Sequence, residues 1–399
     1  MRKNLFILAA ALAVCYSCSN DETVEVNLGN EISFRPMVER TTRAADVTEN
    51  NLQSFNVTAE LEGDTPSEYF SDVTFTASGT VSAQNPSTGE TYTSATKYYW
   101  PSSGNLSFYA YSPIDGASNQ VAMTDYKTFV VTPSTTIASQ VDFVYAGTTG
   151  KNKENNSAGV ALNFRHTGAK IVCQVKNSST ALKFAVDGWK VGYLSPSGKF
   201  TYAAESTDTK NSVTLAYGQW SDWGTRSVDT KYESALSQAV TIDAKTVENN
   251  TDNEHVTLLA GEMILVPQRI TAATAYANSS TPAANDPLNG SFIAVKLKIM
   301  NNDASSTVIA AGASDATIWA IWPIGDAANA QAADQFKWEP GKKYTYTIDL
   351  AGGGYYETNQ NETTVDEDLD KILDGAEIKF VNVTVDDWTD ATGIDVTMP

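Results

Sequence analysis

The stretch "YYWPSSGNLSFYAYSP", from Tyr98 to Pro113, carries aromatic residues at a density far above the chain average. Pro101 and Gly104 interrupt it, and both residue types favour a turn between two strands. The stretch therefore has two readings. Its aromatic side chains either fill the core of a β-sheet or form an exposed platform on which sugars stack.

Burial is the usual fate of aromatic side chains in strands, so the core reading is favoured over the sugar platform. Tyr99, Phe108 and Tyr111 are predicted to fill the core of a β-sandwich. Pro101 and Gly104 are predicted to turn the chain between the strands that carry them.

Short strand patterns extend over the rest of the chain. They alternate apolar and polar residues or are rich in β-branched and aromatic types. Examples are residues 73–81, Leu182–Leu194, Phe292–Ile299 and Tyr344–Leu350. Clusters of Gly, Pro, Ser, Asn and Asp separate them, as turns require. This pattern predicts an all-β protein built from antiparallel Greek-key β-sandwiches.

One segment has a helical pattern. In "EDLDKILDG", Leu369, Ile372 and Leu373 fall on one helix face, and Gly375 is suited to the position after a helix end. A short helix is therefore expected there.

The same segment partly resembles a calcium loop. Alternate acidic residues and a twelfth-position acid supply the ligand pattern, at Asp366, Asp368, Asp370 and Glu377. The sixth position, however, is Lys371, where the loop needs glycine. We therefore interpret the run as a solvated acidic surface and expect no metal and no cofactor.

The first residues indicate export. Arg2 and Lys3 precede an apolar run, Leu5 to Val14, that is too short to span a bilayer and is typical of a signal peptide. Ser17 followed by Cys18 resembles a bacterial lipobox, in which the cysteine is acylated, for example with palmitate. Cys15 is the competing acceptor, and an ordinary signal peptide is the other alternative.

The sequence "SNDE" after Cys18 resembles the surface-export signal of Bacteroidetes lipoproteins. Acyl chains would then hold the precursor at the outer membrane, and no later segment is apolar enough to span a bilayer. Cys173 is the one cysteine in the body of the mature chain, which excludes a disulfide within that body.

Charge and motifs exclude several functional classes. The formal net charge of −20 repels nucleic acid, so no nucleic-acid partner is expected. No metalloprotease, phosphate-loop or nucleophile-elbow motif occurs. The two histidines, His166 and His255, lack ligand spacing, and His166 is interpreted as structural. We therefore expect no enzymatic activity.

A domain boundary is predicted at the polar, turn-rich run from Lys151 to Gly159. Strand patterns end before this run and a new set begins after it. No sequence repeat relates the two halves.

Several stretches together resemble the fimbrillin family of Bacteroidetes, the type V pilins and their Mfa-like relatives. They are "YYWPSSGNLSFYAYSP", "VALNFRHTGAKIVCQV", "MILVPQ", "FKWEPGKKYTYTIDL" and "VTVDDW", scattered from Tyr98 to Trp388. Each is weak alone, but their order along a chain with a lipobox makes the resemblance fairly specific.

The resemblance implies two tandem transthyretin-like β-sandwich domains. With the boundary above, the expected divisions are a signal peptide over 1–17, a lipidated propeptide with a removable strand over 18–43, and domains over 44–158 and 159–399. It also implies a fimbrial subunit at the cell surface that supports adhesion and has other pilin subunits as partners. A host or bacterial surface ligand is a further expected partner.

The alternative function is a surface lipoprotein that does not polymerise and binds glycan. Trp220 and Trp223, in "GQWSDWG", are the candidate stacking residues for that function. Partial burial at a sheet edge is the competing interpretation of this pair.

Residues 30–47, "NEISFRPMVERTTRAADV", suggest a removable strand. Ile32 and Phe34 fall on one face of a short strand, with Val38 further along, and a polar stretch containing Arg40 follows. Exposed arginines in such a stretch are natural protease sites. Because related pilins are processed after arginine, we place the cut between Arg43 and Ala44.

The C-terminal tail "GIDVTMP" is the predicted replacement strand. Ile394, Val396 and Met398 alternate onto one face, as a strand that enters another subunit requires. A plain edge strand of the C-terminal domain is the alternative for this tail.

Overall fold

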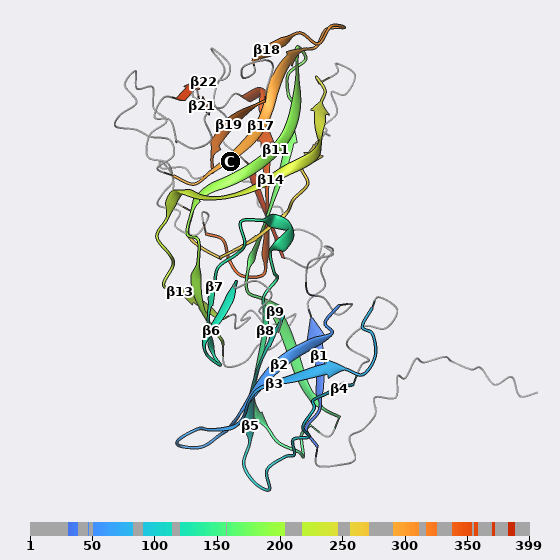
Figure 1. Cartoon of the computed structure of the whole chain (residues 1–399), viewed down its shortest axis with the longest axis vertical. Coiled ribbons are helices and arrows are strands. Elements are labelled where there is room, and N and C mark those ends of the chain that lie inside the picture. Colours follow the sequence, from blue (N-terminus) through green and yellow to red (C-terminus); the bar gives the residue numbers. More distant parts are fainter. Residues whose placement is uncertain are drawn as a thin grey trace, which may run out of the picture.

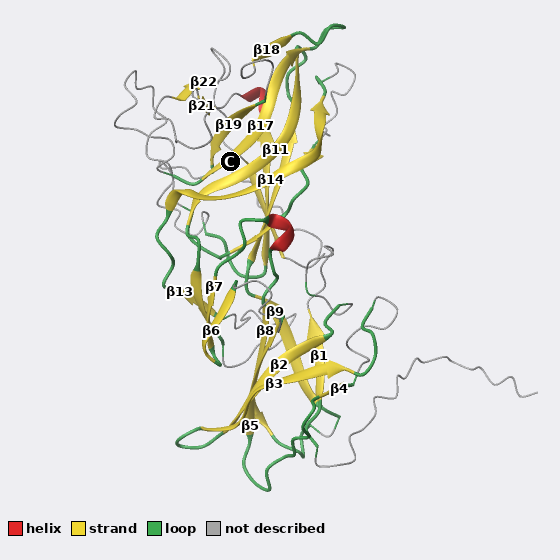
Figure 2. Cartoon of the chain, in the orientation of Figure 1, coloured by secondary structure: helices red, strands yellow, loops and turns green. Residues whose placement is uncertain are grey.

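The computed structural model describes residues 31–38, 47, 51–82, 91–113, 120–156, 158–203, 218–245, 256–270, 290–310, 317–324, 337–352, 355–357, 369–371 and 382–387. Strands dominate these residues, and the described helical segments are short 3-10 turns, η2 (Ile137–Ser139) and η7 (Leu350–Gly352) (Figure 2). The molecule is elongated, with one group of sheets at each end of its long axis (Figure 1).

A seven-stranded sheet, here the N-terminal sheet, forms one end. Its strand order is β1-β9-β8-β5-β2-β3-β4. Only the β1–β9 pair is parallel, and the other neighbours are antiparallel. The strands are β1 (Phe34–Val38), β2 (Ser54–Leu61), β3 (Ser67–Ala77), β4 (Tyr92–Thr93), β5 (Leu106–Ser112), β8 (Val144–Lys151) and β9 (Val160–His166).

The N-terminal sheet curls around its own core. Phe34 lies on β1 at one edge, yet its ring centroid is 4.7 Å from that of Phe75 on β3, next to the other edge. The two ends of the sheet therefore face each other across buried side chains. Phe55, Val57 and Ala59 alternate inward from β2 and are fully buried there.

A four-stranded sheet, here the bridging sheet, covers the outer side of β5 and β8. Its order is β13-β12-β7-β6, with β6 (Val121–Asp125), β7 (Thr128–Val131), β12 (Gly198–Thr201) and β13 (Gln219–Ser221). The sheet thus combines strands from both halves of the sequence. Between it and the N-terminal sheet lies a mainly aromatic core that includes Tyr109, Phe129, Tyr145 and Phe200.

The C-terminal end is a sandwich of two sheets. One sheet has the order β15-β10-β20-β23 with β16 beside β10, and the other has the order β14-β11-β17-β19-β21-β22 with β18 beside β17. The first contains β10 (Ala169–Lys176), β15 (Thr257–Leu258), β16 (Met263–Leu265), β20 (Lys342–Asp349) and β23 (Asn382–Asp387). The second contains β11 (Leu182–Leu194), β14 (Ser227–Ile242), β17 (Phe292–Asn301), β18 (Val308–Ala310), β19 (Ile318–Pro323), β21 (Tyr355–Glu357) and β22 (Leu369–Lys371).

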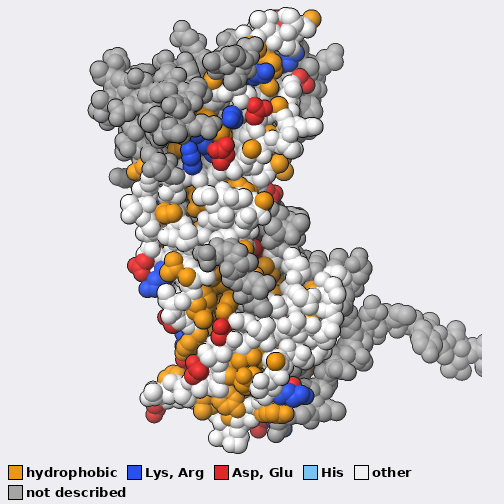
Figure 3. All heavy atoms as spheres, in the orientation of Figure 1, with side chains coloured by type: hydrophobic (Ala, Val, Ile, Leu, Met, Phe, Trp, Pro, Cys, Tyr) orange, Lys and Arg blue, Asp and Glu red, His pale blue; other side chains and the backbone are white. Residues whose placement is uncertain are grey.

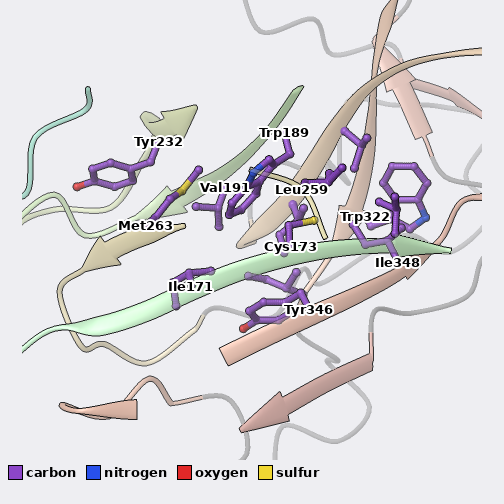
Figure 4. Packing of buried hydrophobic residues seen from close by; sticks show 14 of the residues in the cluster. Ile171, Cys173, Trp189, Val191, Tyr232, Leu259, Met263, Trp322, Tyr346 and Ile348 are labelled. Carbon is purple, nitrogen blue, oxygen red and sulfur yellow. The ribbon is translucent and has the colours of Figure 1, made fainter. Parts of the chain in front are cut away.

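Both sheets of the sandwich contribute to one large core. Figure 4 shows Ile171, Cys173, Tyr346 and Ile348 from the first sheet facing Trp189, Val191 and Trp322 from the second. Burial raises the pKa of the Cys173 thiol well above its usual value, so this free cysteine stays protonated and packs as an apolar side chain.

The all-β prediction is confirmed, and several strand predictions match closely. The predicted strand Leu182–Leu194 is β11 with the same bounds, and Phe292–Ile299 lies within β17. Tyr344–Leu350 overlaps β20 (Lys342–Asp349). The further division into tandem transthyretin-like domains stays a prediction.

Three expectations need correction. Tyr99 is about half exposed rather than in the core, and Leu369–Lys371 form strand β22 rather than the start of a helix. The N-terminal sheet also continues past residue 158, because β9 pairs with β8 and β1. The chain passes to the C-terminal sandwich at Thr167–Gly168, between β9 and β10.

Candidate functional site

The candidate site is the β1 segment, defined as residues 31–38, together with the residues that enclose it. The segment lies at the edge of the N-terminal sheet, beside strand β9, whose paired residues lie 126 positions further along the chain (Figure 1). The Val160 N–H donates to the Ser33 carbonyl at 2.8 Å on one side. On the other side, the Ile32 N–H donates to the Tyr98 carbonyl, also at 2.8 Å. The segment is therefore held from both flanks.

Alternate side chains of the β1 segment point into the N-terminal core. Ile32, Phe34, Pro36 and Val38 are buried, whereas Arg35 is exposed. Backbone N–H groups alternate in direction along a strand, so the N–H of Ile32 and the backbone nitrogen of Pro36 both point away from β9. The N–H that Pro36 lacks therefore costs no hydrogen bond to β9. The predicted strand, with its apolar residues on one face, is confirmed at this position.

Phe34 fills a pocket made of three phenylalanine rings, here called the aromatic socket. Its ring centroid is 4.7 Å from Phe75, 5.3 Å from Phe108 and 6.1 Å from Phe55. All three contacts are edge-to-face, the arrangement that aromatic quadrupoles favour. β2, β3 and β5 each supply one wall of the socket.

The aromatic stretch that begins at Tyr98 forms the second flank of the site. The Tyr98 ring lies 4.5 Å from the Phe70 ring, and the Trp100 ring packs edge-to-face on Phe108 at 5.9 Å. The exposed Tyr99 accepts a hydrogen bond on its carbonyl from the Tyr69 hydroxyl at 2.6 Å. Phe108 is thus the main contribution of this stretch to the core, and the residues from Tyr98 onward flank the β1 segment.

Polar contacts fasten the surface of the β1 segment. Lys97 forms a 2.8 Å ion pair with Glu31, whose hydrogen bond and charge raise the pKa of Lys97. This pair is exposed and therefore contributes little to stability. The Arg35 Nε–H donates to the Gly159 carbonyl at 3.2 Å. Gly159 has a φ of +92°, and a Cβ there would lie 3.1 Å from Ser33 Oγ and 3.2 Å from Arg35 Cγ.

Burial of Ile32, Phe34 and Val38 supplies most of the free energy that holds the segment. Each such side chain contributes about 1.5–3 kcal/mol on burial, or roughly 5–9 kcal/mol for the three. This sum is comparable to the whole stability of a typical domain, about 5–15 kcal/mol. The β1 segment therefore contributes substantially to the stability of the N-terminal sheet.

A buried carboxylate anchors the chain on the far side of the predicted cut. One oxygen of Asp142 accepts the Val47 N–H at 2.8 Å, and the other lies 3.0 Å from His166 Nδ1. Asp142 and His166 have fully buried side chains. His166 thus has the structural role predicted for it. Through Asp142, which bonds both residues, Val47 is held near the end of β9.

Most of the sequence-predicted site residues lie outside the described part of the chain. These are Cys18, Arg40, Arg43, Ala44, Ile394, Val396 and Met398, together with the competing acceptor Cys15. Of the calcium-loop ligands, Asp370 lies in β22, and Asp366, Asp368 and Glu377 are outside the described residues.

The two candidate sugar-stacking tryptophans have different environments. Trp220 is half-buried in β13, packs on Phe200 at 5.3 Å and donates to the Thr167 carbonyl at 3.0 Å. Trp223 is 45% exposed and donates to the Pro267 carbonyl at 2.8 Å. Trp220 therefore supports the bridging sheet, and only Trp223 presents much of its ring to solvent.

The described residues show no cluster of metal ligands and no membrane-spanning helix. Among the described residues, His, Cys, Asp and Glu do not gather in threes as a metal site would need, and no helix is long and apolar enough to cross a membrane. Acidic and basic side chains are interspersed on the face in Figure 3, where apolar side chains gather mainly over the half holding the N-terminal sheet.

Sequence reasoning found the β1 segment but missed most of its surroundings. Phe108 was predicted as core, whereas Phe55, Phe75 and Asp142 were not singled out. The alternation in "SFNVTAEL" and "SDVTFTA" was a usable signal for the two phenylalanines. No sequence signal indicated that Asp142 would meet Val47, 95 residues away.

Comparison with known proteins agrees with this architecture. A crystal structure of a fimbrial protein from Bacteroides vulgatus matches with a TM-score of 0.52 and 13% identity, covering 90% of this chain and all of that one. A fimbrial assembly protein from Parabacteroides distasonis matches at 11% identity and a TM-score of 0.33, covering 92% of this chain and 99% of that one. The first likeness supports a shared fold, and the second is too distant to carry an argument.

No curated protein matches the chain. The sequence profile of the fimbrillin-like family, in contrast, matches residues 42–388, which is most of the chain. The profile begins two residues before the predicted cut and continues through β23. The chain therefore belongs to the fimbrillin-like family.

Proposed function

We propose that this protein is a structural subunit of a fimbrium at the cell surface, where it supports adhesion and has no catalytic role. The observation that carries the proposal is the β1 segment: a short edge strand that buries four alternate side chains and precedes the predicted cut. Family membership agrees with this role.

Cleavage between Arg43 and Ala44 separates the β1 segment from the rest of the chain. Its departure leaves the aromatic socket open and leaves residues 160–164 of β9 without their β1 partner. The described pairing of β9 with β8 covers only Tyr145–Arg165 and Val144–His166. Unpaired edge groups and an apolar surface recruit a replacement strand by β-augmentation.

The tail at Ile394, Val396 and Met398 of a neighbouring subunit is the proposed replacement strand. These residues follow β23, the edge strand of the first sheet of the sandwich. A strand donated from one end of the molecule to the other end of the next gives a linear polymer.

Before cleavage, acylated Cys18 holds the precursor in the outer membrane. The lipid is lost together with residues 18–43 when the chain is cut. A Cys18→Ala variant is therefore expected to leave the membrane fraction and to incorporate no labelled fatty acid. Continued labelling of that variant would assign the lipid to Cys15 instead.

Trimming the full chain tests the proposal. Purified protein is treated with trypsin and examined by size-exclusion chromatography and electron microscopy. Trimmed protein is expected to form oligomers or rods, whereas an Arg40→Ala, Arg43→Ala variant stays monomeric. Deletion of residues 393–399 is expected to prevent polymer formation without preventing the cut.

Two outcomes contradict the proposal. Polymer formation by the uncut double-arginine variant would show that the β1 segment need not leave. Unimpaired polymerisation after tail deletion would reject the tail as the donor. The glycan-binding alternative receives no support from Trp220, whose ring is engaged in the bridging sheet.

A further inference from the structure

We infer that the position vacated by the β1 segment is selective for a strand that carries phenylalanine at the place of Phe34, running parallel to β9. This inference rests on the proposed strand replacement and identifies the chemistry of the partner. It assigns specificity to one side-chain position rather than to general apolar character.

The walls of the socket are fixed by contacts that do not involve Phe34. Phe55 packs on Tyr92 at 4.9 Å and on Phe164 at 5.3 Å. Phe75 and Phe108 both lie against Phe70, with centroids 6.4 and 6.3 Å away. Because these rings support one another, the socket keeps an aromatic-sized space when Phe34 leaves, and a smaller side chain leaves part of that space empty.

The chemistry of the walls favours phenylalanine over other aromatic residues. Phe55, Phe75 and Phe108 offer only hydrocarbon surface and the edges and faces of rings. A tyrosine hydroxyl or a tryptophan N–H needs a hydrogen-bond partner when it is buried. A tryptophan side chain is in addition larger than the one the socket holds, and overfilling a packed core also destabilises it.

Neighbouring positions define the rest of the partner strand. The inward sites of Ile32, Pro36 and Val38 require apolar side chains, spaced two residues apart around the aromatic one. The hydrogen bond between the Ser33 carbonyl and the Val160 N–H, with the parallel register from Phe34–Val160 to Val38–Phe164, fixes the direction. A matching strand therefore reads apolar, Phe, apolar, apolar at alternate positions.

This chain's own tail fits the pattern incompletely. Aligned on the inward sites, the tail places Ile394 or Val396 at the position of Phe34, depending on register. Both side chains are smaller than phenylalanine. The socket is therefore matched to the strand of a different pilin subunit, and self-assembly through the tail is the weaker reaction.

Peptides test the selectivity on trimmed full-chain protein. The probe is fluorescent EISFRPMV, the sequence of residues 31–38, and its variants with Leu or Ala at the Phe34 position. A control peptide carries Lys at the exposed Arg35 position. The Ala peptide is expected to bind about 100-fold more weakly than the parent peptide, and the Leu peptide about tenfold. The control is expected to stay within about threefold.

Ala-peptide affinity within about threefold of the parent, or binding of none of the peptides, overturns the inference. A second measurement uses the tail itself, in the variants Ile394→Phe and Val396→Phe. One of the two, depending on register, is expected to raise the polymerisation rate of trimmed protein about tenfold over an Ile394→Leu control. Equal rates in all variants would contradict the inference.

The two hypotheses fail in different ways. Ranked peptide binding without any polymer from trimmed protein would refute the proposed function and leave the socket's selectivity intact. Polymer formation with unranked peptides would refute the selectivity and leave the proposed function intact.

Discussion

The two ends of the molecule each contain a parallel strand pair. The pairs differ in whether one of the two strands lies at the edge of its sheet. In the N-terminal sheet, β1 is a five-residue edge strand with β9 as its ladder partner. In the C-terminal sandwich, the eight-residue β20 lies between β10 and β23. A strand paired on both sides cannot leave without breaking its sheet, so of these two strands β1 is the one that fits the proposed exchange.

In both pairs, a glycine with positive φ directly precedes one of the two strands. Gly159 precedes β9 with a φ of +92°, and Gly341 precedes β20 with a φ of +67°. Because both pairs share this local feature, the proposed release of β1 rests on its edge position in the sheet and not on local backbone chemistry.

The largest expected effect lies in the sandwich. Trp338 is 1% exposed, and its Nε1–H donates to the Tyr346 hydroxyl at 2.8 Å. Trp338→Ala is expected to lower the free energy of unfolding by about 3–5 kcal/mol, because it leaves a large cavity. Chemical denaturation should show this loss in the uncut and the trimmed protein alike. A loss seen only in uncut protein would mean that the sandwich depends on β1.

Phe34→Ala is the matched change in the N-terminal sheet. It is expected to destabilise the uncut protein by about 3–5 kcal/mol, since Phe34 is as deeply buried and touches three rings. After trimming and release of the segment, wild type and variant become the same molecule and should unfold alike. A persistent difference would show that the β1 segment remains bound after the cut.

Asp142 tests the anchor beyond the cut. Asp142→Ala removes the acceptor of the Val47 N–H and the carboxylate beside His166, at an expected cost of about 1–3 kcal/mol. Hydrogen exchange at the Val47 amide should accelerate. Asp142→Asn keeps an acceptor oxygen and should protect this amide better. Equal exchange in all three proteins would exclude an anchoring role.

The smallest effect is expected at Gly159. Gly159→Ala imposes about 1–2 kcal/mol of left-handed backbone strain and brings a Cβ against Ser33 and Arg35 of the β1 segment. The contact with β1 disappears when the segment leaves, so the variant should release it faster after trimming. Gly341→Ala is the control, with similar strain and no β1 contact. Equal release rates in the two variants would contradict this reasoning.

Local pattern predicted much of the secondary structure. Alternation in Leu182–Leu194 defined β11 to the residue, and the alternation of Ile32, Phe34 and Val38 identified the inward face of β1. Neighbouring side chains of a strand point to opposite faces, so a strand with one buried face has apolar residues at every second position, and this alternation can be recognised in the sequence. The same reasoning failed at Leu369–Lys371, which begin the segment with helical spacing but form strand β22, paired with β21. Tertiary pairing outweighed local preference there.

The sequence by itself determined that this protein is all-β, that a short apolar strand precedes an arginine-containing stretch, and that Phe108 is buried. Only the tertiary structure decided that this strand lies parallel to β9 and that Phe34 is enclosed by Phe55, Phe75 and Phe108. It also placed β9 in the N-terminal sheet rather than after a boundary at residue 158. Strand alternation specifies which face is buried, but which strands become neighbours depends on contacts between residues far apart in the chain.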